Sequence, residues 1–202
     1  MSCANSSRPV RGHLAVLAVL ATTLLSGCAT VGGPGGDSAA RDSVEGQQHQ
    51  QAVAAIAAGD VARAEQLFTE LTRNYPDYAT PWLNLALLQY RRGDPNSAAA
   101  NVDAALQRDD QLAPAWNLQG VLAREINNID AAERAYRQAI AVDASYAPAW
   151  LNLGILLDIW RGQLSAALSA YERYVELSPE DQRDSRVAGW IADLQRRLDR
   201  GA

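Results

Sequence analysis

Few side chains in this 202-residue sequence combine the types and the spacing that catalysis or metal binding requires. The histidines are His13 and His49, and the cysteines are Cys3 and Cys28, so all four lie in the first quarter of the chain. The sequence contains no G-x-S-x-G, no H-E-x-x-H and no phosphate-binding loop. This inventory argues against an enzyme, and we expect no catalytic residue, no metal site and no cofactor.

The remaining candidates for chemistry have a simpler interpretation as surface groups. His49 lies in an Ala-rich and Gln-rich stretch, where an exposed polar helix residue is favoured over a catalytic base. The acid pairs Asp109-Asp110 and Glu180-Asp181 stand at expected helix ends, where carboxylates act as solvated caps. All 18 basic residues are Arg against 23 acidic residues, and a net charge of -5 argues against nucleic acid as a partner.

The N-terminus has the pattern of a secretory signal. Arg8 and Arg11 precede an apolar run from Leu14 to Leu25, which as a helix would rise only about 18 Å, too little for roughly 30 Å of hydrocarbon. A basic start, a short apolar run and small residues are typical of a signal peptide, here residues 1–27.

The residues LSGC, ending at Cys28, resemble the lipobox of bacterial lipoproteins. That resemblance implies cleavage before Cys28 and acylation of its side chain, with Ala29 mildly favouring the outer membrane. The alternative is an ordinary signal peptide with a cysteine nearby. Residues 28–44 are rich in Gly and small polar residues and should form a flexible tether from the lipid to the folded part.

Two phrases of the sequence, APAWNLQGVL from Ala113 and APAWLNLGIL from Ala147, are nearly identical. Their tryptophans and that of ATPWLNLALL form a series with a spacing of 34 residues, Trp82, Trp116 and Trp150. A second series recurs at 34, 34 and 35 residues: Ala64, Ala98, Ala132 and Ala167. A fixed period in this range predicts a solenoid of repeated supersecondary units.

The repeat resembles the tetratricopeptide repeat, whose pattern is W-x2-L-G-x2-Y…A-x3-F…P. The last unit carries the matching residues Trp150, Leu153, Gly154, Ala167, Tyr171 and Pro179. The resemblance implies an all-α, right-handed superhelical solenoid of about four helix-turn-helix units, at residues 45–78, 79–112, 113–146 and 147–181. Residues 182–202 should add a C-terminal capping helix, from about Asp181 to Leu198, and a docking helix for a partner is the alternative.

Small residues and turn residues fall at the positions that such units need. Ala86, Gly120 and Gly154 follow the tryptophans by four residues, so the partner helix can approach that face closely. Turns are expected at Gly59-Asp60, Gly93-Asp94, Asn127-Asn128 and Gly162. One extra residue near Trp160 predicts a longer first helix or a small bulge in the last unit.

In this family the first helices line the concave side of the array. By register, the partner-binding groove would comprise Leu83, Asn84, Leu87, Tyr90, Arg91, Asn117, Val121, Arg124, Leu151, Asn152, Ile155 and Asp158. Leu87, Val121 and Ile155 form an apolar stripe, and the chain has no Lys, so we expect a groove for an apolar helix or extended segment. Packing within the solenoid is the competing explanation of the stripe.

Together these features predict an outer-membrane lipoprotein whose repeat domain faces the periplasm. It would serve as a scaffold for other envelope proteins, of the pilus-biogenesis or peptidoglycan-hydrolase-recruitment type, with the membrane reached through the lipid anchor. Two alternatives stay open: a module that binds a ligand or cell-wall fragment, and a self-associating structural protein.

Overall fold

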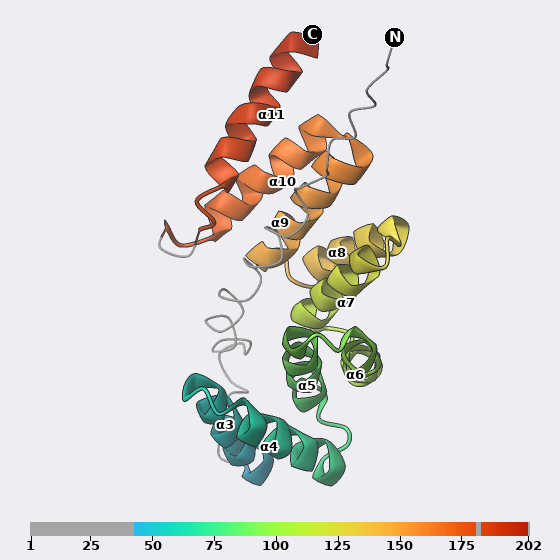
Figure 1. Ribbon diagram of the computed structural model, residues 1–202, viewed down its shortest axis with the longest axis vertical. Coiled ribbons are helices and arrows are strands. Elements are labelled where there is room, and N and C mark those ends of the chain that lie inside the picture. The colour runs from blue at the N-terminus through green and yellow to red at the C-terminus, as the bar shows by residue number, and fades with distance from the viewer. Residues whose placement is uncertain (1–42, 181–182, 202) are drawn as a thin grey trace, which may run out of the picture.

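The computed structural model describes residues 43–180 and 183–201. The predicted signal peptide, Cys28 and nearly all of the predicted tether lie outside these residues. The described part is helical throughout and contains no strand. Figure 1 shows the helix pairs stacked along the long axis, from α3 and α4 at one end to α11 at the other, as expected for an all-α solenoid.

Four antiparallel helix pairs make up the array. The first two pairs are α3 (Val44–Ala57) with α4 (Val61–Asn74), and α5 (Ala79–Arg92) with α6 (Pro95–Arg108). The next two are α7 (Ala113–Glu125) with α8 (Ile129–Val142), and α9 (Ala147–Leu156) with α10 (Leu164–Leu177). A π-helical turn, η2 (Leu157–Arg161), extends α9, and a single helix, α11 (Val187–Gly201), closes the array.

The turns within the pairs form where the sequence predicts them. Gly59, Gly93, Asn127 and Gly162 all have positive φ, between 59° and 83°, which is the left-handed conformation that ends a helix. The residue after the turn then caps the second helix in three pairs. Asp60 and Asp94 accept from the amides of the residues three positions on, at 3.0 and 3.1 Å. Asn128 caps α8 in the same way at 3.2 Å.

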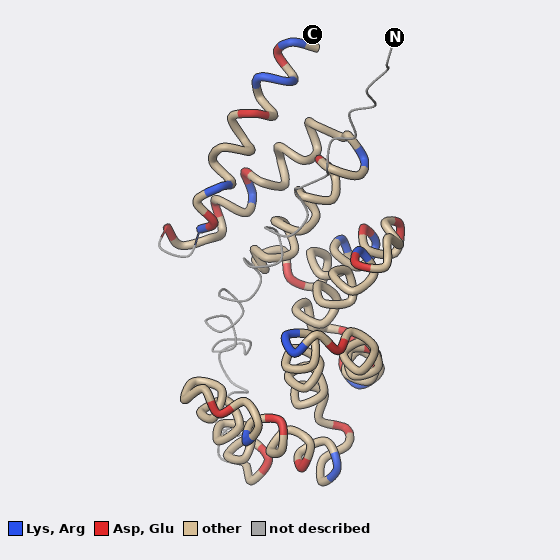
Figure 2. The backbone as a smooth tube through the Cα atoms, viewed as in Figure 1, with Lys and Arg blue, Asp and Glu red and all other residues tan. Residues whose placement is uncertain are grey.

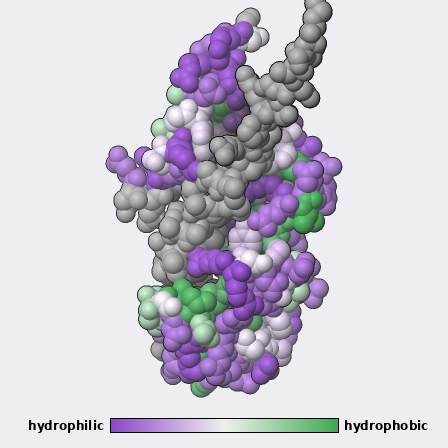
Figure 3. Space-filling view, in the orientation of Figure 1, coloured by the Kyte–Doolittle hydropathy of each residue, from purple (hydrophilic) through white to green (hydrophobic). Residues whose placement is uncertain are grey.

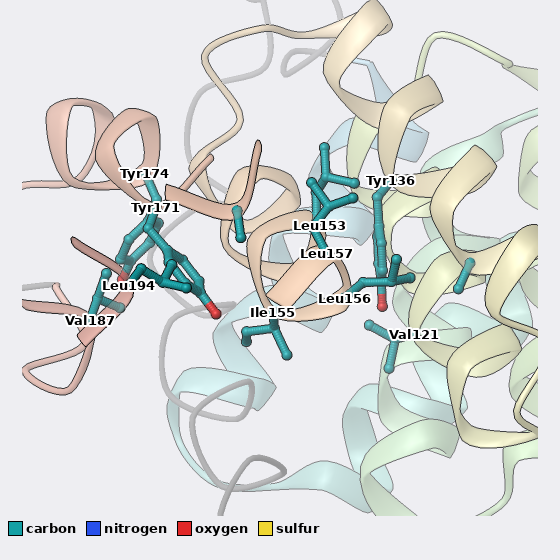
Figure 4. Close-up of a cluster of buried hydrophobic side chains, with 12 residues drawn as sticks. Val121, Tyr136, Leu153, Ile155, Leu156, Leu157, Tyr171, Tyr174, Val187 and Leu194 are labelled. Atoms are coloured by element: carbon teal, nitrogen blue, oxygen red, sulfur yellow. The ribbon is translucent and has the colours of Figure 1, made fainter. Parts of the chain in front are cut away.

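In the last two pairs, a glycine of the first helix lies directly under a tyrosine ring of the second helix. A Cβ atom at Gly120 would stand 2.5 Å from the ring of Tyr136, and one at Gly154 would stand 2.6 Å from the ring of Tyr171. Both tyrosine rings are fully buried and join one core cluster that runs from α7 to α11. Figure 4 shows the two rings on either side of the leucines and isoleucine of α9. The bare glycine faces are therefore what allows the helices of a pair to approach.

The repeated tryptophans fasten the loop before each first helix. The indole Nε1 of Trp82, Trp116 and Trp150 donates to a carbonyl six residues earlier, at 3.1, 2.8 and 2.9 Å. The three rings are only partly buried. The tryptophan-containing segment recurs because each unit needs the same hydrogen bond between its entry loop and its first helix.

The extra residue of the last unit is absorbed by η2, in agreement with the predicted bulge. A π-helical turn widens the helix by one residue and leaves the rest of the repeat in register. Arg161, the last residue of η2, hydrogen-bonds Asp130 and, at 2.9 Å, Glu133 on α8. The widened turn is thus tied to the neighbouring pair.

The capping helix begins later than predicted, at Val187 instead of Asp181. The amide of Asp184 donates to the hydroxyl of Tyr174 at 3.0 Å, and the Asp184 carboxylate accepts from the amide and side chain of Arg186. These contacts hold residues 183–186 in a turn, so the helix starts only after them. Val187 and Leu194 then cover the end of the core, and the arginines of α11 gather toward its C-terminus (Figure 2).

His49 joins the first pair to the second. Its ring centroid lies 5.6 Å from that of Phe68 and 5.7 Å from that of Tyr78, and the Asn84 amide nitrogen lies 3.0 Å from Nε2. The amide donates to an unprotonated ring nitrogen. Burial lowers the pKa of His49 below its ordinary value of 6.5. The expectation of an exposed polar residue was therefore wrong, because Asn84 and two aromatic rings surround the imidazole.

Gly120→Ala should destabilise the chain by about 1–3 kcal/mol, because the new Cβ would overlap the buried Tyr136 ring. Gly189→Ala is the matched control: its Cβ would meet nothing within 4 Å, and it should stabilise α11 by about 0.5–1 kcal/mol. Thermal unfolding followed by circular dichroism measures both. Equal effects of the two substitutions would refute the close packing of α7 on α8.

Stability should fall as the pH drops through the ordinary His value of 6.5. The pKa of His49 is lower in the folded chain than in the unfolded chain, so the unfolded chain binds the extra proton first. His49→Gln should flatten the profile of unfolding midpoint between about pH 7.5 and about pH 5, where carboxylates stay ionised. A parent profile that is already flat in this window would contradict the partly buried, neutral imidazole.

Candidate functional site

All twelve residues predicted to line a partner groove lie on the first helices α5, α7 and α9 with η2. The structure places them in three different environments. Four apolar residues are buried in the array: Leu83, Leu87, Val121 and Ile155. Leu83 and Leu87 belong to the core shared with α6 and α7, and the other two to the core that extends to α11. The expected apolar stripe is therefore packed inside the solenoid, because adjacent pairs cover it.

The three asparagines of the set are buried and paired. Asn152 Nδ2 donates to Asn117 Oδ1 at 2.9 Å, across two neighbouring first helices. Asn84 is bonded to His49 in the same direction, toward the preceding first helix. Buried amides must find partners of this kind, so these residues link successive units. They leave little capacity for a ligand.

Residues near the ends of the first helices form a further set of links. Tyr90 on α5 donates to Glu125 on α7 at 2.7 Å, and burial is the main cause that raises the pKa of its hydroxyl. Asp158 in η2 accepts from Arg197 of α11 at 2.9 Å. The sequence could not show this ion pair, because the two residues are 39 positions apart and the second lies outside the repeat.

Arg124 is the one arginine of the described residues that is buried, with 8% of its surface exposed. Its guanidinium donates to Asn152 Oδ1 at 3.5 Å and lies 5.9 Å from the ring centroid of Trp160. Arg91, in contrast, is exposed and Leu151 is half-buried. Of the twelve predicted groove residues, Arg124, Arg91 and Leu151 are therefore the ones that still have hydrogen-bond donors or apolar surface available to a partner.

Two exposed apolar residues near the ends of the first helices were not among the predicted groove residues. Ile126 is 76% exposed, and Trp160 is 36% exposed. Ile159, which follows the predicted groove residue Asp158, is 57% exposed. Figure 3 shows hydrophobic surface at the right edge at the level of α7 and α8. The sequence signal for this surface was Ile126, an apolar residue directly before the predicted Asn127-Asn128 turn.

No group of three or more His, Cys, Asp and Glu side chains that could hold a metal lies within residues 43–180 and 183–201. Over the same residues, the helices are all too short or too polar to cross a bilayer.

The repeat is recognisable by comparison with known proteins. The family model described as tetratricopeptide repeat matches residues 49–114 and 117–182. Protein O-mannosyl-transferase TMTC1 of Mus musculus is 26% identical over 144 residues, which is 69% of this chain but 15% of that protein. The chain thus corresponds to a small part of this relative.

Solved structures share the fold at low sequence identity. The structure titled as the functional characterisation of Pseudomonas aeruginosa pilF gives a TM-score of 0.67 at 20% identity, over 79% of this chain and 71% of that chain. The first tetratricopeptide repeat domain of Spaghetti (RPAP3), bound to the HSP90 peptide SRMEEVD, gives 0.54 at 17% identity, over 60% and 94%. With the family match covering most of the described residues, the chain belongs to the tetratricopeptide repeat family.

Proposed function

We propose that this protein is a membrane-anchored adaptor that binds protein partners through its row of first helices and has no catalytic activity of its own. Tetratricopeptide repeat proteins are protein–protein interaction scaffolds, and the domain of RPAP3 is seen with a peptide bound. The observation that supports this role here is the row formed by α5, α7 and α9. The ends of this row carry arginines without an ion-pair partner among the described residues, together with exposed apolar side chains. The row itself is held in place by hydrogen bonds of buried asparagine side chains.

The finer proposal is a lipoprotein of the outer membrane that faces the periplasm and supports an envelope assembly. The segment LSGC before and including Cys28, and the Gly-rich stretch after it, support the anchor. Likeness of fold to the pilF structure is compatible with a pilus-related assembly, and recruitment of peptidoglycan hydrolases remains the other form of the proposal. In either form, the partners are envelope proteins and no nucleic acid is involved.

Photo-crosslinking in the cells that make the protein tests the binding face. A photoreactive residue at Arg91 or Ile159, both exposed on the first-helix row, should capture the same partner protein. The same probe at Arg134 or Gln138, exposed on α8, is the matched control and should capture far less. Equal capture from both faces would contradict the proposed face, and crosslinks to a second copy alone would replace the adaptor with self-association.

Cys28→Ser should abolish acylation and shift the protein from the membrane fraction to the soluble fraction, because the acyl chains are the proposed anchor. Cys3→Ser is the matched control, since Cys3 lies in the segment that we expect to be removed. Metabolic labelling with a fatty-acid analogue and fractionation give the readout. Unchanged labelling or unchanged membrane association of the Cys28 variant would refute the lipoprotein proposal.

A further inference from the structure

The four units of the array, α3–α4, α5–α6, α7–α8 and α9–α10, meet at three interfaces, and the two outer interfaces carry the same ion pair. Its arginine is the residue just before the left-handed turn of one unit. Its glutamate follows the repeated alanine on the second helix of the preceding unit. Arg92 donates to both carboxylate oxygens of Glu65, at 2.9 and 3.0 Å, and Arg161 donates to Glu133 at 2.9 Å. We call these two ion pairs the clamps.

The middle interface, which lies wholly within the described residues, has no clamp. The equivalent positions are Ile126, which precedes the left-handed Asn127, and Ala99, which follows the repeated Ala98. Neither side chain can form an ion pair, and Ile126 is 76% exposed. Both members of the clamp are therefore missing from one interface and present at the other two.

The first helices show the same difference between the interfaces. Asn84 and Asn152, each two residues after a tryptophan, form the polar links across the outer interfaces, at 3.0 and 2.9 Å. At the middle interface the equivalent position is Leu118, which lies in the same buried core cluster as Leu83 of the preceding unit. Hydrogen bonds and ion pairs require a particular direction of approach, whereas burial of apolar surface does not. The middle interface is thus held mainly by contacts without a preferred direction.

Two polar links remain at the middle interface, and both are exposed to solvent. Tyr90 donates to Glu125 at 2.7 Å, and Gln119 donates to Asp103 at 3.1 Å. Water competes for exposed hydrogen bonds, and the long Glu and Gln side chains can follow a movement of the helices. These links therefore constrain the angle between the two units less than a clamp and a buried polar pair do.

We propose that this solenoid bends at one joint, the interface between α5–α6 and α7–α8, and is rigid at the other two interfaces. Residues 44–108 and 113–201 move as two blocks, each held by one clamp and one buried polar link. The joint lies between the green and the yellow helices of Figure 1. The row of first helices crosses it, so the curvature of the row changes with the angle between the blocks. The joint is a property of the chain alone and does not depend on the proposed function.

A distribution of distances between the first and the last unit measures this bending. Gln66→Cys and Ser169→Cys place spin labels on exposed positions of α4 and α10, and pulsed electron paramagnetic resonance gives the distribution. The carrier is the full-length chain with Cys3→Ser and Cys28→Ser, so that only the two introduced sites are labelled.

Ala99→Glu together with Ile126→Arg installs the missing clamp, because these positions match Glu65 and Arg92. The double variant should narrow the distribution, whereas each single substitution supplies half of an ion pair and should leave the width unchanged. The matched opposite is Glu65→Ala with Arg92→Ile, which removes a clamp from the first interface and should broaden the distribution. All four positions are exposed or half-buried, so the helix content seen by circular dichroism should stay the same.

Two results would overturn the joint. A width that stays the same when the clamp is installed would mean that the apolar core already fixes the middle interface. A width that stays the same when the Glu65–Arg92 clamp is removed would mean that these ion pairs do not set the angle between units. Either result would leave the adaptor role standing, since that role is tested by photo-crosslinking.

Discussion

The structure depends on one packing constraint: no helix pair of this chain can bury its own apolar face. Glycines at the centre of α7 and α9 let the Tyr136 and Tyr171 rings lie against bare backbone, and those rings complete a core shared with the next pair. Each pair is thus stable only beside a neighbour. The last pair has no fifth repeat to rest on, so α11 supplies Val187 and Leu194 in its place.

The same constraint decides which residues remain for recognition. Stacking the first helices closely enough to share a core buries the leucines and valine that would otherwise form an open stripe. It also forces the buried asparagines to bond across neighbouring first helices, Asn152 to Asn117 and Asn84 to His49. Side chains that could bind a partner remain at the ends of the row formed by α5, α7 and α9. There the π-helical turn of η2 brings an exposed tryptophan to a buried arginine.

Features set by local chemistry were predictable from the sequence. The period of 34 residues, the left-handed turn at Asn127 and the bulge after Leu156 follow from residues that act within a few positions. Features set by distant partners were not. The late start of α11 depends on the Tyr174 hydroxyl, and the burial of Leu87 depends on how closely two pairs stack. Register placed Arg124 on the row of first helices, but it could not show that the side chain is buried beside Asn152 and Trp160.

Hydrogen–deuterium exchange of the chain lacking residues 183–202 tests the sharing of stability between neighbours most directly. Removing α11 uncovers the core formed with α10 and α9, so the amides of these helices should lose protection first while α5 and α6 keep theirs. Unchanged protection in α9 and α10 would show that the last pair is stable alone. That result would contradict the shared core as the basis of the fold.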